Sequence, residues 1–159
     1  MNAADFRSVT LPEALKRLGE MPAILRDAVA GATPAQLRHR PNAESFCLLE
    51  HACHLRDLER EGYAVRLTRM LDEDMPTLEG FEGDVIARER DYMSQDAQGA
   101  AAQFESARAA FLERARSLTG DEMSRTASFM GRTITVCDLL AMMVEHDRGH
   151  RREIEALWR

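Results

Sequence analysis

The chain has 159 residues and a formal net charge of −6, which results from 27 acidic and 21 basic residues. This length predicts a single domain over residues 1–159 with its own hydrophobic core, and the acidic balance argues against a protein that binds nucleic-acid backbones. The three cysteines are odd in number and form no CxxC pair, which argues against a disulfide framework. There is neither a signal-peptide pattern nor an apolar run near the ~20 residues that cross a membrane, so we expect a cytoplasmic protein.

The first predicted helix covers residues 11–25, where apolar residues recur every three or four positions. Thr10 and Glu13 form the pattern of a capping box at its start. Pro22 is expected to kink or restart the helix, because proline lacks the amide hydrogen that a helix interior needs.

A second, longer helix is predicted from Phe46 to Asp72, a segment of strong helix formers without proline. The next stretch, DEDMPTLEGFEGD at residues 72–84, contains one proline and two glycines and is the most loop-like part of the chain. A shorter helical piece is expected over residues 85–93.

Two further helices complete the pattern. Asp96 is expected to cap the first of them, with Gly120 as the residue that ends it. TASFMGRTITV, residues 126–136, is rich in β-branched residues and is expected to be extended. Thr135 then caps the last helix. These elements predict an all-α fold, an up-and-down four-helix bundle with one long crossover loop.

The histidines are unevenly distributed along the chain. Four of the five lie in two short segments of predicted helix: His51, His54, His146 and His150. Residues 146 and 150 are about 40° apart around a helix, so their side chains stack on one face. Met143 and Ile154 continue that face, which places both imidazoles in an apolar stripe where buried polar rings need partners. The competing interpretation is a set of ordinary core or surface histidines.

Two histidines one helical turn apart are also the arrangement by which the HExxH motif binds zinc. In the sequence HDRGH, Asp147 replaces the glutamate that serves as base in HExxH proteases, so the spacing carries over and the protease chemistry does not. His54 adds a third candidate ligand on a partly apolar helix face that it shares with Leu58 and Val65. Three histidines form an open metal site, and imidazole suits zinc, nickel, iron or copper alike.

Three acidic residues lie close enough in the sequence to accept hydrogen bonds from the ring N–H groups of these histidines: Glu50, Asp57 and Asp147. Their alternative role is simple solvation on a helix face. His51 lies about 60° from His54 around the helix and is a further candidate for the site.

In their order and spacing, these segments resemble the DinB/YfiT-like family of bacterial metal-binding four-helix proteins. LRHRPNAESFCLLEHACHLRDLE is similar to the family's arginine–proline pair and following H-L-x-D, and GRTITVCDLLAMMVEHDRGHRREI to its ending with H-D-x-x-H. The resemblance covers nearly the whole chain. It implies a divalent metal ion, zinc or nickel with iron or manganese as alternatives, bound by His54, His146 and His150.

The chain departs from the family pattern beside the first of these histidines. Tryptophan and serine are usual where this chain has Phe46 and Cys47, so capping of the helix is expected to pass to Ser45. His51 is an extra histidine that either competes with His54 for the metal or supports the site from outside the ligand set.

The resemblance further implies a homodimer, and some relatives are transferases or isomerases that use low-molecular-weight thiols. We therefore expect a metal-dependent thiol S-transferase that acts on a small electrophile. Two alternatives stay open: a non-catalytic metal-binding or stress-response protein, and a metal-dependent hydrolase with Glu50 as general base. The expected partners are a small-molecule substrate and a small thiol, with no nucleic acid and no membrane.

Overall fold

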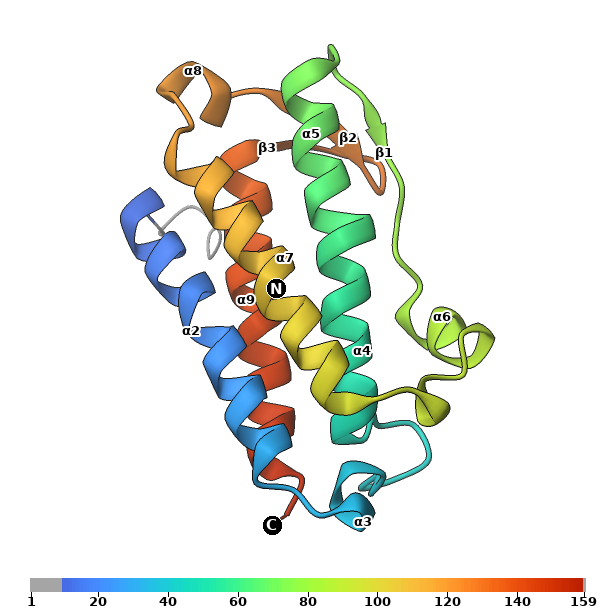
Figure 1. Cartoon of the computed structure of the whole chain (residues 1–159). Helices are drawn as coiled ribbons and strands as arrows, with labels where there is room; N and C mark the ends of the chain where they lie inside the picture. Colours follow the sequence, from blue (N-terminus) through green and yellow to red (C-terminus); the bar gives the residue numbers. More distant parts are fainter. Residues whose placement is uncertain (1–9, 159) are drawn as a thin grey trace.

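Four long helical segments lie side by side in the structure, a computed structural model that describes residues 10–158 (Figure 1). Their bounds are α2 Leu11–Ala30, α4 Leu48–Asp57 continued by the π-helical segment η1 Leu58–Tyr63 and by α5 Ala64–Asp72, α7 Ala97–Arg116, and α9 Val136–Ala156. The predicted all-α four-helix bundle is confirmed. No helix within residues 10–158 combines the length and the apolar composition that a membrane span requires.

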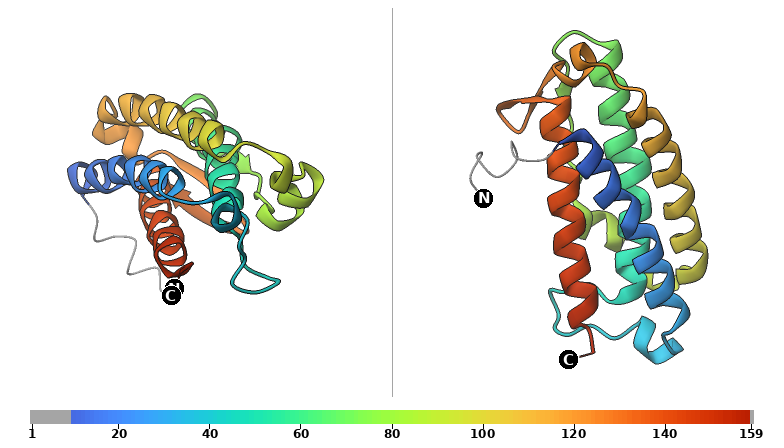
Figure 2. Two further views of the ribbon diagram at one scale, coloured as in Figure 1. Left: turned by 60° about the horizontal axis from the view of Figure 1, so that its bottom comes forward. Right: turned by 90° about the vertical axis from the view of Figure 1, so that its left-hand side faces the viewer.

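The helices do not pack in the order in which the chain forms them. α2 packs mainly against α7 and α9, and α4 packs mainly against α7. The connection between α2 and α4, which contains the short helix α3 (Pro34–Leu37), therefore joins two helices on a diagonal of the bundle. The end-on view in Figure 2 shows this arrangement, with α7 and α9 between α2 and α4.

A long crossover, residues 73–96, connects α5 to α7 and runs along the outside of the second helical segment (Figure 1). It contains β1 (Thr77–Leu78), α6 (Gly83–Glu89) and a 3₁₀ turn η2 (Tyr92–Ser94). The helix expected over residues 85–93 thus begins earlier and ends at Glu89. Because of this connection, α7 runs in the same direction as α4, and α9 runs opposite to both.

The β-branched stretch forms a hairpin of β2 (Thr126–Phe129) and β3 (Arg132–Thr135). The prediction that this stretch is extended is confirmed. Met130 and Gly131 both have positive φ, 51° and 78°, which is the conformation of a two-residue turn between tightly twisted strands. β1 pairs in parallel with β2, so that the crossover is fixed to the hairpin at one end of the bundle.

α2 continues through Pro22 and does not restart there. A proline inside a helix leaves the carbonyl four residues earlier without its usual donor. That carbonyl belongs to Leu18, and it accepts a hydrogen bond of 2.9 Å from Nη1 of the buried Arg108 on α7. A side chain from another helix therefore replaces the missing amide.

Two capping predictions are wrong. Gly120 does not end α7, which already stops at Arg116, but begins the short helix α8 (Gly120–Met123). The start of α4 is capped at Cys47, whose backbone N–H donates to the Glu50 carboxylate at 3.1 Å. Ser45, the expected cap, instead donates from its hydroxyl to Asn42 Oδ1.

The π-helical segment η1 changes which side chains share a face of the second helical segment. A π turn takes up an extra residue, so the residues beyond it are rotated relative to a continuous α-helix. Val65, predicted on the face of His54, is 46% exposed, whereas Tyr63 and Arg66 are 5% and 6% exposed. The face that begins with His54 and Leu58 therefore continues with Tyr63 and Arg66.

Candidate metal centre

Three histidines from two helices converge on one point of the bundle interior. His54 projects from α4, and His146 and His150 project from successive turns of α9. Nε2 of His146 lies 3.4 Å from Nε2 of His54 and 3.0 Å from Nε2 of His150. One ring nitrogen of each residue lies within 4.8 Å of the others, as required for one shared ion.

The spacing of these nitrogens fits a single bound cation. Two nitrogens that are each about 2.0–2.1 Å from a zinc ion, at angles of about 90–110°, lie about 2.8–3.4 Å apart. The distances of 3.0 and 3.4 Å fall in that range. The three residues that the sequence selects thus offer a compatible set of donors.

Burial keeps these imidazoles in the form that a metal binds. Desolvation lowers the pKa of His54 to about 4. Desolvation, and then the neighbouring His54, lower the pKa of His146 to about 3. The pKa of His150 is lowered by the same causes, burial first and the other histidines second. All three rings are therefore neutral at pH 7, and only neutral imidazole coordinates a cation.

His51 contacts the centre from behind His150. Its Nδ1 lies 2.8 Å from Nδ1 of His150, and its Nε2 lies 3.6 Å from a carboxylate oxygen of Glu153. When the lone pair of His150 Nε2 points toward the other two histidines, the proton of His150 is on Nδ1 and is donated to Nδ1 of His51. His51 then carries its own proton on Nε2, which points toward Glu153. This chain of contacts fixes the His150 ring. The role of Glu153 was missed because the residue lies on an exposed part of α9.

A second group of possible ligands uses the same contacts. One ligand atom each from His51, His150 and Glu153 also lies within 4.8 Å of the others. Glu153 has a side chain that is 63% exposed, whereas the three-imidazole group consists of the buried His54 and the half-buried His146 and His150. His54, His146 and His150 are therefore the better candidate set.

Glu50 and Asp57 do not support the histidines as predicted. Glu50 is bound at both oxygens by Arg40, at 2.7 and 2.8 Å. Asp57 accepts hydrogen bonds from Arg56 and Arg90 and, at 2.6 Å, from the hydroxyl of Tyr92. Both carboxylates point away from the histidines, because Arg40 and Arg90, which lie outside α4, bind them.

Asp147 is also held away from the imidazoles. Arg108 binds it at 2.6 and 3.1 Å and binds Glu59 at 2.9 and 3.0 Å on its other side. Although burial opposes it, the two carboxylates raise the pKa of Arg108. Within residues 10–158, Nδ1 of His54 and of His146 is buried without a hydrogen-bond partner, so the predicted carboxylate contacts to these rings are wrong.

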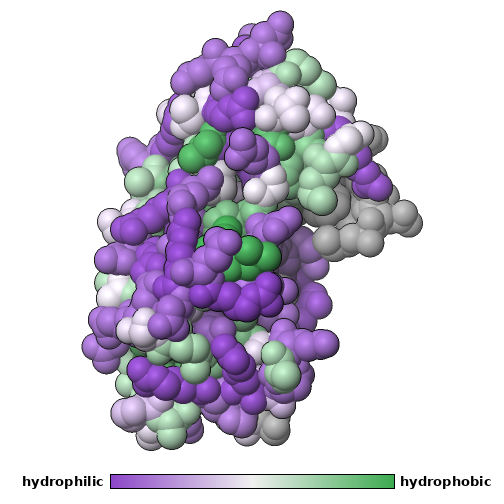
Figure 3. All heavy atoms as spheres, turned by 90° about the vertical axis from the view of Figure 1, so that its right-hand side faces the viewer, coloured by the Kyte–Doolittle hydropathy of each residue, from purple (hydrophilic) through white to green (hydrophobic). Residues whose placement is uncertain are grey.

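A pocket of about 580 Å³ opens beside His54 and His146. Its wall is mostly apolar and aromatic, with residues from both helices, the crossover and the hairpin, including Leu58, Tyr63, Phe81, Phe129, Met130 and Met142. Figure 3 views the side of the molecule that carries the crossover and shows apolar side chains exposed there among hydrophilic ones. A volume of this size accommodates a small organic molecule next to the histidines.

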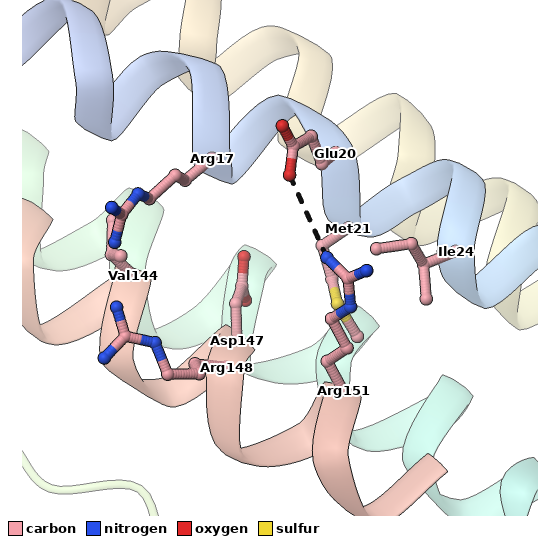
Figure 4. A pocket seen from close by; sticks show the side chains of 8 residues that line it. All are labelled: Arg17, Glu20, Met21, Ile24, Val144, Asp147, Arg148 and Arg151. Atoms are coloured by element: carbon pink, nitrogen blue, oxygen red, sulfur yellow. Dashed lines mark ion pairs between the residues drawn. The ribbon is translucent and has the colours of Figure 1, made fainter. Parts of the chain in front are cut away.

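A second pocket, of about 330 Å³, lies between α2 and α9 (Figure 4). It is lined by three arginines that each pair with a carboxylate, Arg17 with Glu13, Arg148 with Glu145, and Arg151 with Glu155 and more distantly Glu20. Since its cations are already paired and the three candidate ligands do not line it, this pocket is a weaker candidate for a binding site.

The chain belongs to the DinB superfamily, whose family model matches residues 17–154. Among solved structures it is similar to YfiT from Bacillus subtilis, with a TM-score of 0.87, 22% sequence identity, and coverage of 95% of this chain and 89% of that chain. YfiT is described as a probable metal-dependent hydrolase with an unusual four-helix bundle topology. At this identity the likeness shows the fold. No curated protein matches the chain.

Proposed function

We propose that this protein is a metal-dependent enzyme that transfers a small thiol to an electrophile, with a divalent ion held by His54, His146 and His150. Zinc or nickel is the expected ion, with iron or manganese as alternatives. The observation that carries the proposal is the convergence of three neutral imidazoles, the buried His54 and the half-buried His146 and His150, beside an apolar pocket that His54 and His146 line.

A divalent cation at these nitrogens supplies Lewis acidity, which lowers the pKa of a coordinated thiol or water. The chain supports that chemistry because neutral imidazoles leave the charge of the cation undiminished. Burial of the rings also excludes water from one side of the site. His51 and Glu153 fix the orientation of the His150 ring.

The nucleophile of the proposed reaction does not come from the chain's buried cysteines. Burial raises the pKa of the Cys47 thiol to about 11 and that of Cys53 to about 12, so both are protonated at neutral pH. The Sγ of Cys47 contacts Met93, and neither cysteine lines the pocket beside the histidines. A thiol of external origin suits this arrangement better.

Hydrolysis is the second candidate function. Glu50, the base that the sequence suggested, is bound by Arg40 and does not face the pocket beside the histidines. Glu145, however, lines the same pocket as His146 and is a candidate base, although Arg148 binds its carboxylate at 2.8 Å. The description of YfiT agrees with this alternative.

One comparison separates the candidate functions. Metal-free, metal-loaded and His146→Ala protein are assayed with a panel of small thiols against an electrophilic aromatic dye, and in parallel with ester and amide substrates. The transferase proposal expects thiol conjugation that needs both the metal and His146. Thiol conjugation that is no faster with metal-loaded than with metal-free protein would refute the transferase proposal. Cleavage of esters or amides without thiol conjugation would favour the hydrolase. Inactivity in both assays would favour a non-catalytic protein. The thiol partner, the homodimer and the cytoplasmic location stay predictions.

A further inference from the structure

Arg66 on α5 is a buried cation without an anionic partner in the part of the chain that the structure describes. Its side chain is 6% exposed, and no carboxylate within residues 10–158 forms an ion pair with it. Nη2 donates to the backbone oxygen of Glu79 at 3.2 Å, and Nε is buried without an acceptor. Arg108 is equally buried and binds two carboxylates. A guanidinium stays charged at neutral pH, so its burial without an anion is costly unless a ligand supplies one.

Two aromatic rings hold this guanidinium in place. Its Cζ lies 4.6 Å from the ring centroid of Phe129 on β2 and 5.6 Å from that of Tyr63. Such contacts offset part of the cost of burial and fix the orientation of the planar group, but they provide no hydrogen-bond acceptors. The donor at Nε therefore stays without an acceptor within residues 10–158.

Arg66 lines the same pocket as the candidate metal centre. The ring of Tyr63 contacts both, since its centroid lies 6.0 Å from that of His146. Between them the wall is apolar, and Phe81 packs against the ring of His54 with centroids 5.8 Å apart. Glu82 and Glu145 also line the pocket, but Glu145 binds Arg148 and Glu82 is exposed to solvent.

We infer that the pocket takes a small amphipathic carboxylic acid, with its carboxylate on Arg66, its apolar body against the aromatic wall and its reacting end toward His54 and His146. A singly charged carboxylate suits the pocket better than a doubly charged phosphate, because two glutamates lie at its rim. The orientation of the reacting end rests on the proposed function. Binding of the carboxylate by Arg66 is independent of it.

The inference is tested first on metal-free wild-type protein, so that no cation other than Arg66 can hold the acid in the pocket. Isothermal titration calorimetry compares 4-phenylbutyrate with 4-phenylbutyramide, which has the same shape and no charge. We expect the acid to bind about 10-fold more tightly, as a charge-assisted hydrogen bond of roughly 1.4 kcal/mol requires. Equal affinity for acid and amide, or no binding of the acid, would overturn the inference on the wild-type protein alone, before any variant is measured.

Variants then assign the preference to one residue. Arg66→Met should abolish the preference for the acid, Arg66→Lys should retain part of it, and Arg60→Met, which removes an exposed arginine of the same helical segment, should leave it unchanged. Circular dichroism checks that each variant is folded. If Arg66→Met does not fold, Arg66→Lys decides, because unchanged affinity for the acid in that variant would contradict a bidentate guanidinium contact.

Metal-loaded protein separates this inference from the proposed function. A preference for the acid that arises only with metal and persists in Arg66→Met would place the carboxylate on the metal and overturn the role of Arg66. A preference that depends on Arg66 in protein that shows no metal-dependent activity would support the inference and refute the proposed function.

Discussion

Nδ1 of His51 and Nδ1 of His150 lie 2.8 Å apart, although 99 positions separate the two residues in the chain. The contact joins α4 to α9 directly behind one of the three candidate ligands. It gives the extra histidine, which the family pattern does not explain, a defined role in orienting another ring.

His51→Ala should weaken metal binding without abolishing it. The His150 ring would lose the acceptor that fixes it, and loss of such a contact lowers metal affinity roughly 10–100-fold. Competition with a coloured chelator measures the affinity, with His39→Ala as control because His39 is exposed. Complete loss of the metal would make His51 a ligand, and unchanged affinity would exclude the orienting role.

His150→Ala and His146→Ala should each leave the protein without a stoichiometric metal ion. The wild type should retain about one divalent ion per chain, with nitrogen ligands at roughly 2.0–2.2 Å. Elemental analysis after gel filtration gives the stoichiometry, and X-ray absorption gives the distances. The same metal content in His150→Ala as in the wild type would remove these residues from the ligand set.

Gly83→Ala should disturb His54 although it leaves every candidate ligand in place. A Cβ at position 83 would lie 2.8 Å from Cε1 and 3.0 Å from Nδ1 of the His54 ring, so the ring must move. Metal affinity should therefore fall. The matched control is Gly80→Ala in the same crossover, where an added Cβ meets nothing within 4 Å. Equal affinity in both variants would show that the ring has room to adjust.

The metal-free protein should lose stability as the pH falls from about 6.5 to about 4. Unfolded histidines have a pKa near 6.5, whereas burial lowers the pKa of both His51 and His54 to about 4. In this window the unfolded chain binds more protons, so each such histidine lowers the free energy of unfolding by up to roughly 1.4 kcal/mol per pH unit.

Urea unfolding at a series of pH values measures this dependence. His51→Gln should show a shallower slope, because it removes one of the buried groups that titrate only on unfolding. An equal slope in this variant and in the wild type would assign the pH dependence to other groups. Metal affinity should stay nearly constant down to about pH 5, since the folded rings are already neutral there.

Arg108→Met should destabilise the bundle by roughly 3–5 kcal/mol, because it leaves two buried carboxylates, Glu59 and Asp147, without their counter-ion. It also removes the donor that satisfies the Leu18 carbonyl opposite Pro22. Denaturant unfolding measures the loss, with Arg114→Met near the exposed end of the same helix as control. A loss below about 1 kcal/mol would mean that the carboxylates find other partners or take up protons.

The sequence predicts the helices and the shared face of His146 and His150 because both depend on local periodicity, and the resemblance to the family adds His54 as the third candidate ligand. It does not predict the partners of Glu50, Asp57 and Asp147, since each carboxylate is bound by an arginine whose position depends on the tertiary fold. Nor does it predict Arg66 as part of the pocket. A regular helix from residue 46 to 72 places Val65 on that face, and only the π-helical segment between Leu58 and Tyr63 brings Arg66 there.

The π-helical segment has a consequence for how proteins of this fold diverge. Deleting one residue between Leu58 and Tyr63 would remove the extra residue that the π turn takes up and restore a regular helix, so the residues beyond it would keep their faces. His54, Tyr63 and Arg66 would all still face the pocket. A chain of this fold that is one residue shorter in this segment can therefore place an arginine at the same point of the pocket, and an alignment without a gap there would pair Arg66 with a residue on a different face of the helix.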